Sequence, residues 1–199
     1  YHVIPTGAQG LCAADLKLEP PIRILATPRS LPNSKLAMTR KAYTVEEANA
    51  ALPRLEDVFQ RLETKKSAVH HHDQKLQVLD ALWGEALTRT TNPDRATFDG
   101  HRERVDELIR DIKEIVENEI LAAGIRFPPG GLEHGLLDFP TTYKGRWVLL
   151  CWQRGEPAVS FWHELTGGFS GRQEIAAEHI ITMGKEDDQA TFDDSDLNF

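Results

Sequence analysis

Two long amphipathic stretches constrain the fold of this 199-residue chain more than any other feature. In each stretch, apolar residues recur three and four positions apart, which is the spacing of one face of an α-helix. The first stripe contains Leu55, Val58, Phe59, Leu62, Val69, Leu76, Leu79 and Trp83, and the second contains Val105, Leu108, Ile109, Ile112, Ile115, Val116 and Ile120. A turn signal at 90–93 separates them, so we expect a long antiparallel helical hairpin over 44–124.

Local signals mark where the helices begin and end. Thr44 and Glu47 fit a capping box, in which each side chain bonds the backbone amide of the other residue. Pro53 suits the first turn of a helix better than a helix interior. We therefore expect a short helix to about residue 51, a longer helix from Pro53, and an end to the second long helix at Gly124.

The stretch 125–173 is rich in glycine and aromatic residues and is expected to supply a small antiparallel β-sheet. The predicted strands cover 136–139, 146–152 and 158–163. If the loop between the last two has an even number of residues, Arg146 and His163 share one face and Cys151 lies on the other.

Both faces of this sheet are apolar, and only one of them can lie on the hairpin. The other face needs a cover, for which the N-terminal arm, the segment 175–183 and another subunit are the candidates. We therefore expect a homodimer.

These elements predict an α+β fold in which a long helical hairpin packs against a small antiparallel sheet. The length suits one compact domain, which we place at 42–173. Residues 1–41 contain five prolines and are expected to be an extension or linker, and 174–199 an acidic tail. Both termini are expected to be disordered or loosely packed.

The charge and composition exclude several classes of protein. The net charge of −8 argues against a nucleic-acid binder, which normally has a basic face. No apolar run reaches the roughly 18 residues that a transmembrane helix needs, and the start resembles no signal peptide. Cys12 and Cys151 form no C-x-x-C pair, which favours a reducing compartment, so we expect a cytoplasmic protein.

Several motifs, in order along about 42–173, resemble a bacterial family known as domain of unknown function 2203 (DUF2203). The resemblance implies no established activity. It does imply that Met38 lies near the natural start of the protein. The motifs are Tyr43-Thr44-Val45-Glu46-Glu47-Ala48-Asn49-Ala50-Ala51-Leu52-Pro53, Gly135-Leu136-Leu137-Asp138-Phe139-Pro140, Leu150-Cys151-Trp152, Gly155-Glu156-Pro157 and Phe161-Trp162-His163.

Two kinds of catalytic site can be built from these residues. Cys151 activated by His163 would be a thiol nucleophile, but the predicted register separates them, so a buried structural cysteine is favoured. Asp138, Glu156 and His163, with His134 as a possible fourth, suit a divalent metal ion such as zinc, although no strong metal-binding spacing is present. The structural alternative is that His163 pairs with a carboxylate or caps the hairpin.

A third candidate is a pocket for a small anionic ligand. The glycines of 166–172 can present backbone amides, and Arg172 can bind a carboxylate or phosphate through two bonds. Arg146 and His163 would lie beside this loop, with Trp162 as an aromatic wall. The structural alternative is a glycine-rich turn whose arginine pairs with Asp138 or Glu156.

These observations leave three hypotheses. The first is a ligand-binding or assembly module with an anion pocket formed by Arg146, His163, Arg172 and Trp162. The second is a small metal-dependent hydrolase that uses Asp138, Glu156 and His163. The third is a purely structural role for every polar residue named.

Overall fold

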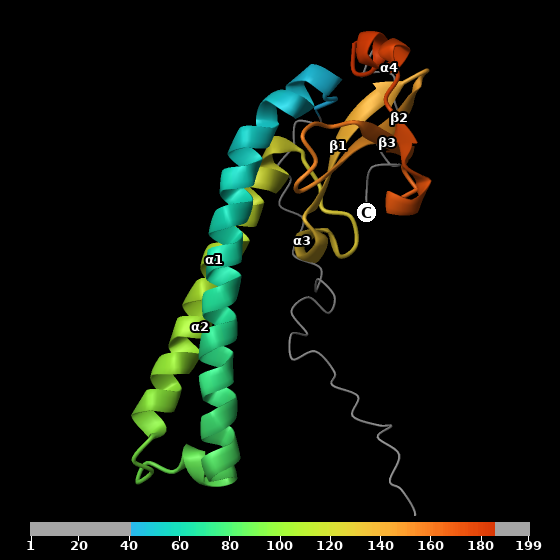
Figure 1. The fold of residues 1–199 in the computed structure, drawn as a ribbon. Helices are drawn as coiled ribbons and strands as arrows, with labels where there is room; N and C mark the ends of the chain where they lie inside the picture. The colour runs from blue at the N-terminus through green and yellow to red at the C-terminus, as the bar shows by residue number, and fades with distance from the viewer. Residues whose placement is uncertain (1–40, 186–199) are drawn as a thin grey trace, which may run out of the picture. The chain divides into compact units, whose positions relative to one another are not determined.

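The computed structural model describes residues 41–185 (Figure 1). Over this range the chain forms two long helices and a four-stranded antiparallel sheet, so the predicted α+β class is confirmed. The predicted extension over 1–40 and the acidic residues over 186–199 lie outside the described residues.

The first long helix, α1, is continuous over Val45–Trp83. Thr44 Oγ1 accepts a hydrogen bond from the Glu47 amide at 3.1 Å, and the Glu47 carboxylate accepts one from the Thr44 amide at 3.0 Å. The predicted capping box is therefore confirmed. The predicted break at Pro53 is wrong, because this residue lies on an exposed side of the helix, where water can bond the carbonyl that a proline amide cannot reach.

The second long helix, α2, spans Arg95–Ile115 and continues through a π-helical turn at Val116–Ile120 and a 3₁₀ turn at Leu121–Ala123. Gly124 follows with a φ of 77°, in the left-handed region where a glycine has no steric cost. The predicted glycine stop is therefore confirmed.

Contacts between α1 and α2 show that the two helices run antiparallel. Arg61 bonds the Glu119 carboxylate at 2.6 Å, and Lys65 bonds Asp111 at 2.6 Å. Near the turn, the Trp83 indole donates to Asp94 at 2.8 Å. Residues later in α1 therefore contact residues earlier in the second helix, which is the pattern of an antiparallel hairpin. A 3₁₀ turn at Gly84–Thr88 begins the connection between the helices (Figure 1).

The sheet has the strand order β1-β2-β3-β4, and every neighbouring pair is antiparallel. Lys144 and Gly145 form the two-residue turn between β1 and β2, with φ of 51° and 75°. Two positive φ values give the turn twist that suits a right-twisted hairpin. The bounds are β1 Leu136–Tyr143, β2 Arg146–Gln153, β3 Phe161–Glu164 and β4 Gln173–Glu174, and a short helix α3 at Gly131–His134 precedes them.

The pairing of β2 with β3 differs from the predicted register. Leu149 lies opposite His163, and Cys151 lies opposite Phe161. Residues directly opposite in an antiparallel pair share a face, so Cys151 and His163 lie on the same face of the sheet. The prediction assumed an even loop, but an odd number of residues, 154–160, separates the two strands.

The other face of the sheet forms the hydrophobic core with α1. Its side chains include Phe139, Leu150 and Trp162, which pack in one cluster with Val58 and Leu62 of the helix. The remaining sheet residues of this cluster are Leu137, Tyr143, Val148 and Trp152. The first half of α1 therefore covers this face.

Part of the predicted acidic tail belongs to the folded domain. Residues 174–185 include the end of β4 and the helix α4, Ala177–Thr182. Met183 is fully buried in the main core, and the His179 ring packs against Tyr143 and Trp162 at 5.0 and 5.4 Å between ring centroids. The tail therefore begins later than position 174.

No helix within residues 41–185 combines the length and the apolar character that crossing a bilayer requires.

We predict that Leu62→Ala lowers the free energy of unfolding by about 2–5 kcal/mol, because Leu62 is 1% exposed in the core and its loss leaves a cavity. Denaturant unfolding measures this. Gln60→Ala, two positions away on the exposed side of the same helix, should change the stability by less than about 0.5 kcal/mol. Equal losses for the two variants would contradict the proposed core.

We also predict that acidification weakens the hairpin at His72. Its Nδ1 lies 2.9 Å from His101 Nδ1, so one ring must accept and must be neutral there. Burial is the largest cause that lowers the pKa of His72, and the charges of His101 and His71 lower it further. At acidic pH the unfolded chain therefore binds more protons than the folded chain. The contribution of the His72 contact to the stability is complete above about pH 6.5 and is lost as the pH falls through the pKa that His72 has in the folded state.

Thermal unfolding at about pH 7.5 and about pH 5.5 measures this effect, since these values bracket the ordinary histidine pKa. His72→Ala should show a smaller loss of melting temperature on acidification than the wild type. The same loss in both proteins would remove His72 as a source of the pH dependence.

Candidate metal centre

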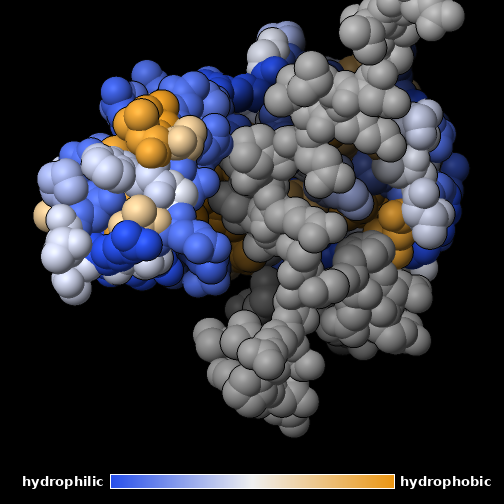
Figure 2. Space-filling model, turned by 90° about the horizontal axis from the view of Figure 1, so that it is seen from below, coloured by the Kyte–Doolittle hydropathy of each residue, from blue (hydrophilic) through white to orange (hydrophobic). Residues whose placement is uncertain are grey.

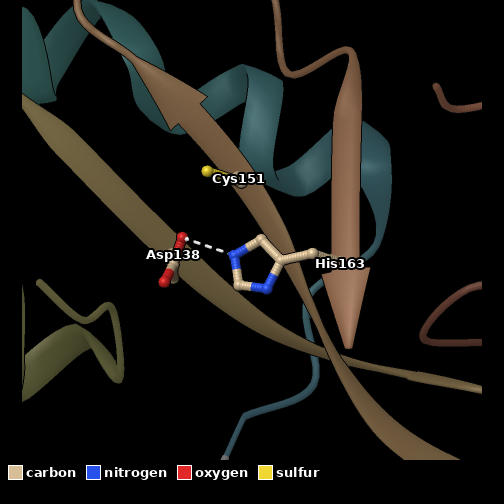
Figure 3. A group of neighbouring side chains, drawn as sticks. All are labelled: Asp138, Cys151 and His163. Atoms are coloured by element: carbon tan, nitrogen blue, oxygen red, sulfur yellow. Dashed lines mark hydrogen bonds and ion pairs between the residues drawn. The ribbon is translucent and has the colours of Figure 1, made fainter. Parts of the chain in front are cut away.

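Three adjacent strands bring Asp138, Cys151 and His163 together on the sheet face away from the main core (Figure 3). Asp138 on β1 lies directly opposite Cys151 on β2. His163 on β3 lies two residues beyond Phe161, the β3 residue opposite Cys151, so its side chain emerges on the same face. One oxygen, one sulfur and one nitrogen of the three side chains all lie within 4.8 Å of one another.

Burial isolates this cluster from solvent. The exposed fractions are 3% for Asp138, 1% for Cys151 and 2% for His163. Among residues 41–185, it is the only group of three histidine, cysteine or acidic side chains whose ligand atoms come this close. A buried carboxylate must be compensated by a partner charge, a proton or a cation.

The hydrogen bonds of His163 define the state of its ring. Nδ1 lies 2.7 Å from the Glu164 carbonyl oxygen, which can only accept, so Nδ1 carries a hydrogen. Nε2 lies 3.4 Å from Asp138 Oδ1. In a neutral ring Nε2 presents a lone pair, which a carboxylate cannot satisfy, so this contact requires either a proton or a cation between the two atoms.

The surroundings act on the pKa of His163 in opposite directions. Burial lowers it, but the hydrogen bonds to Asp138 and to the Glu164 carbonyl, with the charge of Asp138, raise it above its usual value overall. Without a metal ion, the ring is therefore stabilised as an imidazolium beside the Asp138 carboxylate.

The Cys151 thiol is unsuited to nucleophilic catalysis by itself. Burial raises the pKa of Cys151 to about 12, and the charge of Asp138 and its hydrogen bond act in the same direction. The thiol therefore stays protonated near neutral pH, whereas a nucleophile needs the thiolate. The predicted register, which separates Cys151 from His163, is wrong, but the favoured interpretation of a buried structural cysteine agrees with this environment.

Backbone contacts hold Asp138 and His163, the two outer residues of the cluster, in place. Asp138 exchanges two backbone hydrogen bonds of 2.9 Å with Arg126, which forms an isolated bridge along the outer edge of β1. The turn after β3 folds close to His163: a Cβ atom on Gly167 would lie 3.4 Å from the His163 Cβ. The Glu164 carbonyl accepts from both the Gly167 amide, at 2.8 Å, and the His163 ring.

Glu156, which the sequence analysis places in the metal site, pairs with Arg172 instead. Arg172 Nη2 lies 2.7 and 2.8 Å from the two carboxylate oxygens. The guanidinium also lies over the rings of Phe161 and Phe169, at 4.0 and 4.8 Å from their centroids. This pairing is the structural alternative for Arg172, and Cys151, not Glu156, lies beside Asp138 and His163.

The four residues predicted to form an anion pocket do not converge. Arg146 makes a two-bond ion pair with Glu164, at 2.7 and 3.2 Å. Trp162 is buried in the main core, on the opposite face from His163. The expectation that Arg146 and His163 share a face is therefore wrong, for the same reason of register.

The other histidines between residues 41 and 185 are not part of the cluster. His134 is an exposed residue at the end of α3. His70 contacts Gln74, and His72 faces His101 on the other helix of the hairpin.

The sequence feature that would have placed Cys151 beside His163 is the loop 154–160, because it contains an odd number of residues.

We predict that Cys151 in the native protein resists thiol reagents. In a Cys12→Ser background near neutral pH, metal-free native protein should react at least about a hundredfold more slowly than urea-unfolded protein, because the thiol is buried and protonated. A colorimetric disulfide reagent measures both rates. Comparable rates would show that the thiol is accessible or ionised in the folded state.

Comparisons with known proteins place the chain in a family. The family model described as an uncharacterized conserved protein (DUF2203) matches residues 41–175. No curated protein and no solved structure matches the chain. The match covers more than half of the sequence and agrees with the resemblance over about 42–173. The chain therefore belongs to the DUF2203 family of uncharacterized conserved proteins.

Proposed function

We propose that the protein binds a divalent transition-metal ion, with zinc preferred, through Asp138, Cys151 and His163. The observation that carries the proposal is the meeting of an oxygen, a sulfur and a nitrogen ligand atom within 4.8 Å on three adjacent strands. Three such ligands, each nearly fully buried, match the number that a zinc site with an open position uses.

The ligand types favour zinc over the hard cations. A cysteine sulfur and an imidazole nitrogen suit zinc and other softer transition metals, whereas magnesium and calcium prefer sites made of oxygen atoms. Two anionic ligands, the Asp138 carboxylate and the Cys151 thiolate, would balance the charge of the ion. The ion would displace the thiol proton, as it does whenever cysteine binds a metal.

The orientation of His163 also supports this proposal. Its Nδ1 hydrogen is donated to the Glu164 carbonyl, which leaves Nε2 as the ligand atom on the side of Asp138. Metal-binding histidines commonly donate their second ring nitrogen to a carbonyl or carboxylate in this way, because the bond fixes the tautomer and the ring plane.

A hydrolytic reaction is a second candidate, favoured by the number of ligands. Three protein ligands leave one position of a tetrahedral zinc ion for water, and zinc lowers the pKa of that water enough to form a nucleophile. The predicted metal-dependent hydrolase therefore stays a proposal, with Cys151 in place of Glu156. Arg172 is already paired with Glu156, so it receives no role in this reaction.

We predict that tag-free protein, purified without nickel and dialysed against zinc, retains about one zinc ion per chain by elemental analysis. Cys151→Ser, Asp138→Asn and His163→Gln should each weaken binding more than about a hundredfold, beyond the loss usual for residues that only support a ligand. Cobalt substitution should give a thiolate-to-metal charge-transfer band that disappears in Cys151→Ser.

Glu156→Gln is the matched control, because Glu156 belongs to the sequence-predicted ligand set but lies outside the cluster. It should keep the metal. Circular dichroism checks that each variant is folded. Folded wild-type protein without metal, or loss of metal in Glu156→Gln alone, would refute the proposed ligand set.

A further inference from the structure

Two histidines from different helices meet on the hairpin. His72 lies on α1 and His101 lies on α2, and their Nδ1 atoms are 2.9 Å apart. The centroids of the two rings are 5.1 Å apart, with an angle of 56° between the ring planes. The two residues are 29 positions apart in the sequence, so the packing of α1 against α2 brings these nitrogens together.

The pair is accessible to small solutes. His72 and His101 are both partly exposed, in contrast to the cluster on the sheet, whose three residues are almost fully buried. The hairpin, at the left in Figure 2, presents a mainly hydrophilic surface. A hydrated ion can therefore reach the two rings in the folded protein.

The hydrogen bond between the rings leaves both Nδ1 atoms available as metal ligands. In a neutral pair, one proton lies between the two Nδ1 atoms. An ion in its place would take a lone pair from each ring, and the proton would move to Nε2 of the same ring, so each ring would keep one hydrogen. The χ2 angle of histidine is soft, so small rotations can direct both lone pairs at one ion.

The distance between the two nitrogens indicates which ions fit. With metal–nitrogen bonds of about 2.0–2.1 Å, nitrogens 2.9 Å apart subtend an angle of about 90° at the ion. A tetrahedral zinc ion would hold them about 3.3–3.4 Å apart. An angle of about 90° belongs to square-planar and tetragonal coordination, which copper(II) and nickel(II) adopt with nitrogen and oxygen ligands.

We propose that His72 and His101 form a two-histidine site for nickel(II) or copper(II), which binds Nδ1 of both rings and links α1 to α2. Water completes the coordination of the ion. The site is independent of the proposed zinc site, because its ligands lie on the hairpin and those of the zinc site lie on the sheet.

The neighbouring side chains do not complete this site. Successive residues of a helix point about 100° apart, so His71 does not direct its ring at the same ion as His72. Within residues 41–185, no third histidine, cysteine or acidic ligand atom lies within 4.8 Å of both rings. The charge of Arg104 opposes a cation at His72, but Arg104 is itself paired with Glu107 at 2.8 Å. Binding is therefore expected to be weaker than at a site with three protein ligands.

Titration calorimetry of the full chain with nickel chloride, at about pH 7.5 where histidine is neutral, tests the proposal. His101→Asn should weaken one binding event at least about tenfold, because it removes one of two protein ligands. The run of histidines at 70–72 stays intact in this variant, so nickel held by that run alone would be unaffected. His70→Asn, on an exposed position of the same helix as His72, is the matched control and should bind like the wild type.

A second variant at the same position separates ligand loss from damage to the fold. An aspartate oxygen occupies nearly the place of histidine Nδ1, so His101→Asp should bind nickel at least about tenfold more tightly than His101→Asn, which has the same shape but no charge. Nickel should also raise the melting temperature of the wild type more than that of His101→Asn, because the ion binds the folded hairpin.

Two outcomes would overturn the proposal. One is equal nickel binding by the wild type and His101→Asn. The other is a loss in His70→Asn as large as that in His101→Asn, which would assign the ion to the run of histidines on α1. The sheet cluster is unchanged in all of these variants, so its own metal binding cancels in every comparison.

Discussion

The register of β2 between β1 and β3 determines what both faces of the sheet contain. With Cys151 opposite Asp138 on one side and Phe161 on the other, odd and even positions of β2 separate cleanly between the faces. The even positions Val148 and Leu150 point to the helices and complete the core. A shift of β2 by one residue would exchange its two faces, turning Cys151 towards α1 and removing Val148 and Leu150 from the core. The fold and the candidate site therefore depend on the same hydrogen-bond pattern.

The polar cluster opposes the stability that the core provides. A carboxylate, a thiol and an imidazole with almost no solvent contact are costly to bury. Within the cluster they are compensated by the 3.4 Å contact of His163 with Asp138 and by the hydrogen bond between Cys151 and Asp138. A simple core would use apolar residues at these positions. A bound cation would satisfy all three groups at once, whereas the imidazolium and carboxylate pair leaves the thiol as a neutral filler. The contrast with Arg172 and Glu156, which satisfy each other directly, makes the cluster the feature of this sheet that needs a chemical explanation.

The sequence was informative wherever the cause of a structure is local. Thr44 and Glu47 predicted the helix start, because a capping box involves residues three apart. The hairpin followed from apolar spacing, and Gly124 from its tolerance of positive φ. Pro53 misled because its cost depends on whether water can reach the freed carbonyl, which is a matter of exposure. Residues 174–185 were assigned to the tail because their acidic neighbours dominate the composition, although Met183 lies in the core.

By itself, the sequence determined the α+β class, the two long helices and the family. It also named Asp138 and His163 as partners in a polar site. Only the tertiary structure decided that Cys151 joins them and that Glu156 and Arg146 do not. The reason is physical: alternation along a strand is visible in the sequence, but the face that each alternate residue takes depends on the parity of the loop 154–160 and on pairing between distant residues.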